Sequence, residues 1–196
     1  MLRAASMRSR RVHVPLLVMV LALAADMLGG CGGRSISASV SAQRERAALV
    51  SYLRKVEPIR LAVNRLLAGA DPILSAYHDN RISPRQASLR MGALERRFAA
   101  YTVDMAAIQP ATAQLRSVNA PYAHTYILED SYLSALTTGL QERNLDRLPD
   151  TQSAQRAAII QWRTGLTVLA RRAALELPGD LQAAGRGEIA PSPQGS

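Results

Sequence analysis

The 196-residue chain has one cysteine and few aromatic residues, and Lys55 is its only lysine. A single cysteine, Cys31, excludes an internal disulfide, a zinc site built from several cysteines and an iron–sulfur cluster held by this chain alone. Apolar residues make up 48% of the chain, which is close to the globular average and excludes a collagen-like or wholly disordered protein. The length fits one domain together with a processed segment.

The motifs of common catalytic and metal sites are also missing. The chain has no glycine-rich phosphate loop, no Gly-x-Ser-x-Gly and no Cys-x-x-Cys-His. After the first thirty residues, only His78 and His124 can supply imidazole ligands, and no second histidine or glutamate is spaced to share a helical face with either. We therefore predict that the protein is not an enzyme and holds no cofactor or metal. Carboxylate pairs that converge only in space leave an enzyme as the third and weakest alternative.

The N-terminal region has the pattern of a secretion signal. Arg3, Arg8, Arg10 and Arg11 precede an uninterrupted apolar run, Val14–Ala25. Twelve apolar residues match the hydrophobic region of a signal peptide and fall short of the roughly 20 that a membrane-spanning helix needs. We interpret residues 1–30 as a cleaved signal peptide.

The apolar run leads into Leu28-Gly29-Gly30-Cys31, which resembles the lipobox of bacterial lipoproteins. The resemblance implies that the Cys31 thiol receives a diacylglyceryl group, that cleavage precedes Cys31, and that its amine is then acylated, with palmitate as a typical chain. Two or more acyl chains anchor a protein stably. The expected location is therefore the extracytoplasmic face of the cell membrane. The alternative makes Cys31 a small residue near a cleavage site, with a free thiol.

The export route has two interpretations. Ser9-Arg10-Arg11 partly resembles a twin-arginine signal, which carries proteins that are already folded, but Val12 and His13 depart from that pattern. The alternative is an ordinary positively charged start of a signal peptide.

The charge balance favours anionic surfaces as partners. Residues 1–30 hold four arginines and one aspartate, so 20 basic and 14 acidic residues remain after them, a net charge of +6. This charge would be attracted to an anionic membrane leaflet or wall polymer. Nucleic acid is not an expected partner, since no basic run is interleaved with aromatic residues.

Composition divides the remaining chain into three parts. Residues 31–41 contain the lipidated cysteine and then small and polar residues, which are typical of a flexible tether. Residues 178–196 have too little apolar content to pack, so we predict a disordered tail. Residues 42–177 are long enough to bury a core without a disulfide or metal.

Apolar spacing in residues 42–177 predicts four helices. The second helix has the clearest start, with Ser83 as N-cap, Pro84 at the first helical position and Gln86 completing a capping box, and Pro110 ends it. Its apolar seam is Ala87, Met91, Leu94, Phe98, Tyr101, Met105 and Ile108. The third helix begins near Pro110 or Pro121, and the fourth runs from Asp150 or Thr151 to Leu177.

The first helix repeats its apolar pattern straight through two prolines. Residues 49, 56, 63, 70 and 77 form one row, and the row passes Pro58 and Pro72. This continuity favours one bent helix of about 38 residues, and the alternative is a separate short helix that opens at Asp71-Pro72. Short connections favour antiparallel neighbours, so the predicted fold is all-α, an up-down-up-down four-helix bundle.

Two polar residues, Asn119 and Glu129, occupy seam positions of the third helix. A carboxylate that faces the interior needs a partner or stays protonated. One hypothesis is a polar pocket for a small ligand. Its residues would be Tyr101, Tyr122, Tyr126, Glu129 and Trp162. The alternative is a purely structural role, in which Glu129 pairs with Arg97 or Arg163, or lies exposed on a rotated helix.

These observations lead to two function hypotheses. The first is a lipid-anchored extracytoplasmic helical bundle that acts by binding, as a scaffold or accessory subunit for an envelope protein. The alternative is a solute- or lipid-binding lipoprotein, which requires a cavity of at least a few hundred Å³ at the polar and aromatic pocket.

Overall fold

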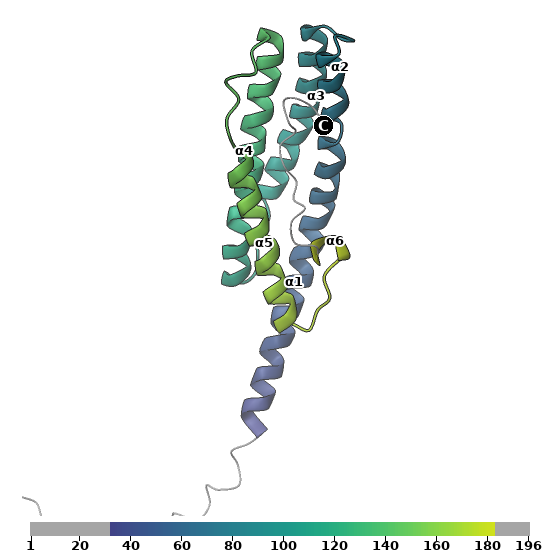
Figure 1. Ribbon diagram of the computed structural model, residues 1–196. Coiled ribbons are helices and arrows are strands. Elements are labelled where there is room, and N and C mark those ends of the chain that lie inside the picture. Colours follow the sequence, from purple (N-terminus) through teal and green to yellow (C-terminus); the bar gives the residue numbers. More distant parts are fainter. Residues whose placement is uncertain (1–31, 183–196) are drawn as a thin grey trace, which may run out of the picture. The chain divides into compact units, whose positions relative to one another are not determined.

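The computed structural model describes residues 32–182. Within this range the chain forms helices and no strands, which confirms the all-α prediction. The helices, shown in Figure 1, are α1 (Gly32–Leu67), α2 (Ala70–His78), α3 (Pro84–Ala106), α4 (Ala113–Glu142), α5 (Gln152–Arg172) and α6 (Gly179–Gln182). The predicted signal peptide and Cys31 lie outside the described residues.

Helix α1 begins earlier than the sequence suggested. Its first ten residues, 32–41, are helical where we expected a flexible tether. These residues contain no proline, and extending a helix that is already formed adds one hydrogen bond for each residue fixed. Gly32 and the serines that follow are poor helix formers, but they do not stop a helix that continues from a well-packed segment.

The predicted single bent helix is two helices, so that prediction was wrong. Pro58 remains inside α1, but the backbone leaves the helix after Leu67 and α2 starts at Ala70. Pro72 then lies in the first turn of α2, where its missing N–H costs nothing. In a continuous helix its ring would have clashed with the carbonyl of Ala68. The break therefore comes just before the Asp71-Pro72 opening that we considered as the alternative.

Helix α3 starts as the sequence predicted. The Gln86 backbone N–H donates to Ser83 Oγ (3.2 Å), and the Ser83 N–H donates to Gln86 Oε1 (2.9 Å), which completes the capping box. The seam of α3 packs into the core, with Tyr101 only partly buried.

The hydrophobic core takes buried side chains from α1, α2, α3, α4 and α5. Helix α4 packs against both α3 and α5, and α2 packs against α3 (Figure 1). Thr112 caps α4 through a hydrogen bond from the Leu115 N–H, and Pro121 lies inside the helix. Asn119 and Glu129 are buried on one face of α4, as their seam positions predicted, together with Leu115, Tyr122, Tyr126, Leu133, Leu136 and Leu140.

The C-terminal part of the core extends past its predicted end at residue 177. Residues 179–182 form α6, and Leu181 is 1% exposed, so these residues are not part of a disordered tail. The buried side chain of Leu181 and the ion pair between Asp180 and Arg60 attach this segment to the core, although its composition is mostly polar. Residues 183–196 lie outside the described part of the chain.

Candidate functional site

Glu129 lies inside the protein, on α4, with only 4% of its surface exposed. The Gln155 side-chain amide on α5 donates a hydrogen bond to Glu129 Oε2 (2.8 Å). The other oxygen, Oε1, has no hydrogen-bond partner among the described residues. Burial raises the pKa of Glu129 to about 7, although the hydrogen bond from Gln155 acts to lower it. The carboxyl group can therefore gain or lose a proton near neutral pH.

Gln155 is the hydrogen-bond partner that the sequence analysis missed. The candidates there were Arg97, which is exposed, and Arg163, which is buried on α5. Gln155 could have been found from its spacing, since it lies seven residues before Trp162 and so shares that face of α5.

A small cavity adjoins Glu129. Its volume is about 20 Å³, which is room for roughly one water molecule. Its walls come from α1, α3, α4 and α5, and are Val63, Leu67, Phe98, Thr125, Tyr126, Glu129 and Gln155. The internal ligand pocket requires a space at least ten times larger.

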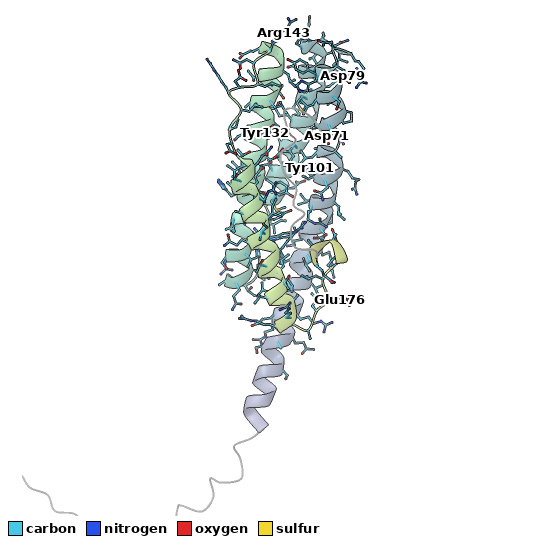
Figure 2. The ribbon with its side chains drawn as sticks, in the orientation of Figure 1. Asp71, Asp79, Tyr101, Tyr132, Arg143 and Glu176 are labelled. Atoms are coloured by element: carbon cyan, nitrogen blue, oxygen red, sulfur yellow. The ribbon has the colours of Figure 1, made fainter. Side chains whose placement is uncertain are left out.

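Aromatic rings fill the space beside Glu129. The rings of Tyr122 and Trp162 stack with centroids 3.9 Å apart and an angle of 9° between their planes. Tyr126 meets Tyr122 edge-on at 5.6 Å and stacks on Phe98 at 5.8 Å. The structure thus brings together four of the five predicted pocket residues. Tyr101 (Figure 2) is the exception, because it lines a groove on the surface.

Asn119, the second polar residue of the α4 seam, belongs to a buried hydrogen-bond chain. Trp162 Nε1 donates to the Tyr52 hydroxyl, which donates to Asn119 Oδ1, and both distances are 2.8 Å. The chain joins α5, α1 and α4. Burial raises the pKa of Tyr52, which keeps its hydroxyl protonated as the donor to Asn119.

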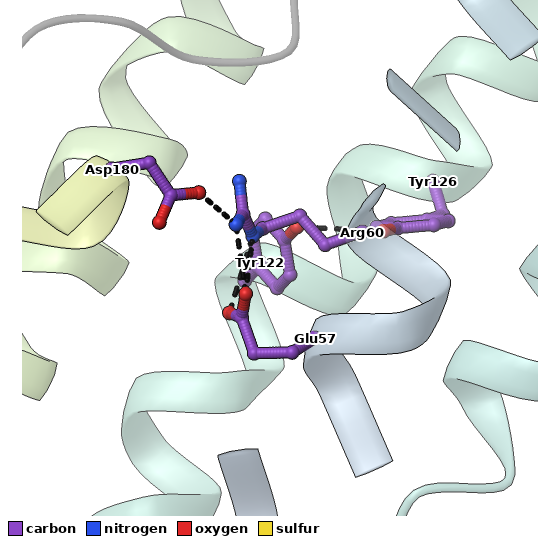
Figure 3. Close-up of polar contacts among 5 residues, drawn as sticks. All are labelled: Glu57, Arg60, Tyr122, Tyr126 and Asp180. Atoms are coloured by element: carbon purple, nitrogen blue, oxygen red, sulfur yellow. Dashed lines mark hydrogen bonds and ion pairs between the residues drawn. The ribbon is translucent and has the colours of Figure 1, made fainter. Parts of the chain in front are cut away.

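Arg60 is a second buried charge that the sequence analysis did not identify. It lies on α1 with 2% of its surface exposed. Figure 3 shows its ion pairs with Glu57, one turn earlier at 2.7 Å, and with Asp180 of α6. Burial acts to lower the pKa of Arg60, but the two carboxylates outweigh burial and raise it. Arg60 therefore stays charged and attaches α6 to α1.

Two larger hollows lie on the surface, on either side of α3. One has a volume of about 590 Å³ and is mainly acidic, with three carboxylates, Glu95 from α3 and Asp130 and Glu142 from α4, against one arginine, Arg147. Burial and the charge of Glu95 raise the pKa of Asp130. The other has a volume of about 470 Å³ and contains Arg65 from α1 and two arginines from α3. In the part of the chain that the structure describes, no group of three acidic, histidine or cysteine side chains is placed to hold a metal ion.

Among the helices described, none combines the length and the apolar character needed to cross a membrane. Comparisons with protein-family models, with curated proteins and with solved structures found no match.

Proposed function

We propose that this protein is a lipid-anchored, extracytoplasmic helical protein that acts by binding, as a scaffold or accessory subunit of an envelope complex. The observation that carries the anchor is the sequence Leu28-Gly29-Gly30-Cys31 directly after a twelve-residue apolar run. In this proposal residues 1–30 are removed and Cys31 carries the acyl chains. Two or more chains hold the protein on the membrane.

The packing of the interior favours a binding role on the outer surface. Stacked rings occupy the centre of the core, and the space at Glu129 admits about one water molecule. Both surface hollows are more than ten times larger than that space. A partner is therefore expected on the outside of the helices, and no observation favours the internal pocket of the alternative hypothesis.

We also propose that the helices form an up-down-up-down bundle, with α1 and α2 together in the place of the first helix. The buried seams on α3, α4 and α5 support this arrangement, because each faces the common core. In this bundle the four columns are α1 with α2, α3, α4 and α5.

The anchor is tested by metabolic labelling with a clickable palmitate analogue. We expect the parent chain to be labelled and to fractionate with membranes, and Cys31→Ser to be unlabelled. Ser35→Ala, four residues further on, is the matched control and should be labelled like the parent. Equal labelling of parent and Cys31→Ser, or none in either, would contradict the proposal.

The binding role is tested with a photo-crosslinking residue placed in the cell at Leu89 or Val103, two α3 side chains that are 63% and 69% exposed. We expect at least one position to give a discrete adduct with an envelope protein at native expression. The same residue at buried Leu133 should give none. If every exposed position on all helices left the protein uncrosslinked, the scaffold role would be wrong.

A further inference from the structure

The surface hollow of about 470 Å³ that contains three arginines, here called the basic groove, lies where the break between α1 and α2 faces α3. Arg65 comes from the last turn of α1, and Arg90 and Arg97 come from α3. Because Arg90 and Arg97 are seven residues apart, they lie on the same face of α3, two turns from each other. Among the residues that the structure describes, no acidic residue lines the groove. Three guanidinium groups therefore converge on one concave surface.

Within residues 32–182, the three arginines have no ion-pair partner. Arg60 pairs with Glu57 and Asp180, and Arg81 pairs with Asp79. In contrast, none of the three groove arginines makes an ion pair or a side-chain hydrogen bond with a residue that the structure describes. Like charges that share a groove repel one another, and a bound anion removes that repulsion.

An apolar floor distinguishes this groove from a simple basic patch. Leu66 and Leu94 are buried beneath the arginines, and the half-buried ring of Tyr101 forms part of the wall. Guanidinium groups bind phosphate through paired, planar hydrogen bonds. Leu66 and Leu94 are only 7% and 6% exposed, so this floor fits the short glycerol segment attached to a lipid phosphate and leaves little surface for an acyl chain.

We propose that this groove binds the phosphate headgroup of an anionic lipid. This inference depends on the proposed function in one respect, which is that the protein works beside a membrane. Binding of the headgroup itself does not require an acylated cysteine. Its test is made without the anchor, so that either proposal can fail alone.

The test uses the full chain carrying Cys31→Ser, titrated by calorimetry with a short-chain phosphatidylglycerol below its micelle concentration. We expect saturable binding that Arg90→Gln/Arg97→Gln weakens by about tenfold or more. The control is Arg85→Gln/Arg96→Gln, which removes the same charge from α3 outside this groove and should change the dissociation constant by less than about twofold. Helix content by circular dichroism checks that each variant is folded.

Four results would overturn the proposal. The first is equal weakening by both double variants, which would mean attraction to net charge alone. The second is inorganic phosphate binding as tightly as the short-chain lipid, since the apolar floor would then contribute nothing. The third is self-association that only the groove variant abolishes. The arginines would then bind the hollow of a second copy that contains Glu95, Asp130 and Glu142. Short-chain phosphatidylcholine should bind at least about tenfold more weakly, and equal binding would also contradict the proposal.

Discussion

At the scale of single residues, the most unusual feature is a carboxyl group inside an aromatic core. Burial raises the pKa of Glu129 from 4.5 in its ordinary state to about 7 in the folded protein. The folded state therefore binds the proton more tightly than the unfolded state does. Stability from this group is fully present below about pH 4.5 and is lost as the pH rises through about 7.

We predict that Glu129→Gln removes this pH dependence. The shift corresponds to about 3 kcal/mol between the two ends of the range, at about 1.4 kcal/mol for each pKa unit. Urea unfolding at a series of pH values from 4 to 9 should show the parent losing stability as the pH rises and Glu129→Gln staying flatter. The exposed control Glu142→Gln should follow the parent. An unchanged slope in Glu129→Gln would mean that the buried carboxyl is not the titrating group.

The hydrogen-bond chain through Tyr52 gives a second prediction at this scale. Tyr52→Phe removes the hydroxyl that accepts from Trp162 and donates to Asn119, so two buried polar groups lose their partner. We expect a loss of about 2–3 kcal/mol in the free energy of unfolding. In Tyr52→Phe/Asn119→Leu the loss should be smaller than the sum of the two single losses, because one orphaned group is gone.

Tyr77→Phe is the matched control, since the Tyr77 hydroxyl makes no hydrogen bond with a described residue. Its unfolding free energy should change by less than about 0.5 kcal/mol. Additive losses in the Tyr52 and Asn119 double variant would show that the chain is not energetically coupled.

The contacts of these residues were only partly predictable. Spacing along one helix placed Asn119, Glu129 and Trp162 in the core, because burial follows the helical period. It did not identify their partners, which come from other helices. Arg60 and Asp180 are 120 positions apart in the sequence, and no local pattern links two such residues.

At the scale of helices, signals that lie within a few residues were reliable. The capping box of Ser83 and Gln86 needs only one turn of chain, and it appears as predicted. The break between α1 and α2 was missed for the opposite reason. The seven-residue row continues through the break, with Val63 and Ala70 both buried, so the apolar pattern carries no sign that the backbone leaves the helix.

The contact between α4 and α5 provides a prediction at this scale. A Cβ added at Gly165 would lie 2.6 Å from Val118 Cγ2, so the two helices approach closely at a residue without a side chain. We expect Gly165→Ala to destabilise the protein by about 1–3 kcal/mol, although alanine favours the helix more than glycine does. Thermal unfolding followed by circular dichroism measures the change.

Val118→Ala should relieve the clash, so that Gly165→Ala/Val118→Ala is more stable than Val118→Ala alone or within about 0.5 kcal/mol of it. Gly179→Ala is the control, because a Cβ there meets nothing within 4 Å. If Gly165→Ala were harmless in the parent, the close approach of α4 and α5 would be wrong.

At the scale of the whole molecule, the described residues combine a closed interior with charged grooves on the surface. The core is filled by stacked rings and apolar side chains, while the basic and acidic grooves lie on either side of α3. The helical class followed from periodicity, but the grooves did not, because they depend on which residues of different helices share a surface. The proposed lipobox rests on the resemblance of four neighbouring residues, Leu28-Gly29-Gly30-Cys31, so it comes from sequence alone and awaits a direct chemical test.

That test is mass spectrometry of the N-terminal peptide from protein purified from its own membrane. The account predicts that the chain begins at Cys31 and that this residue carries a diacylglyceryl group on sulfur. A chain that begins at any other residue, or a Cys31 with an unmodified thiol, would contradict it.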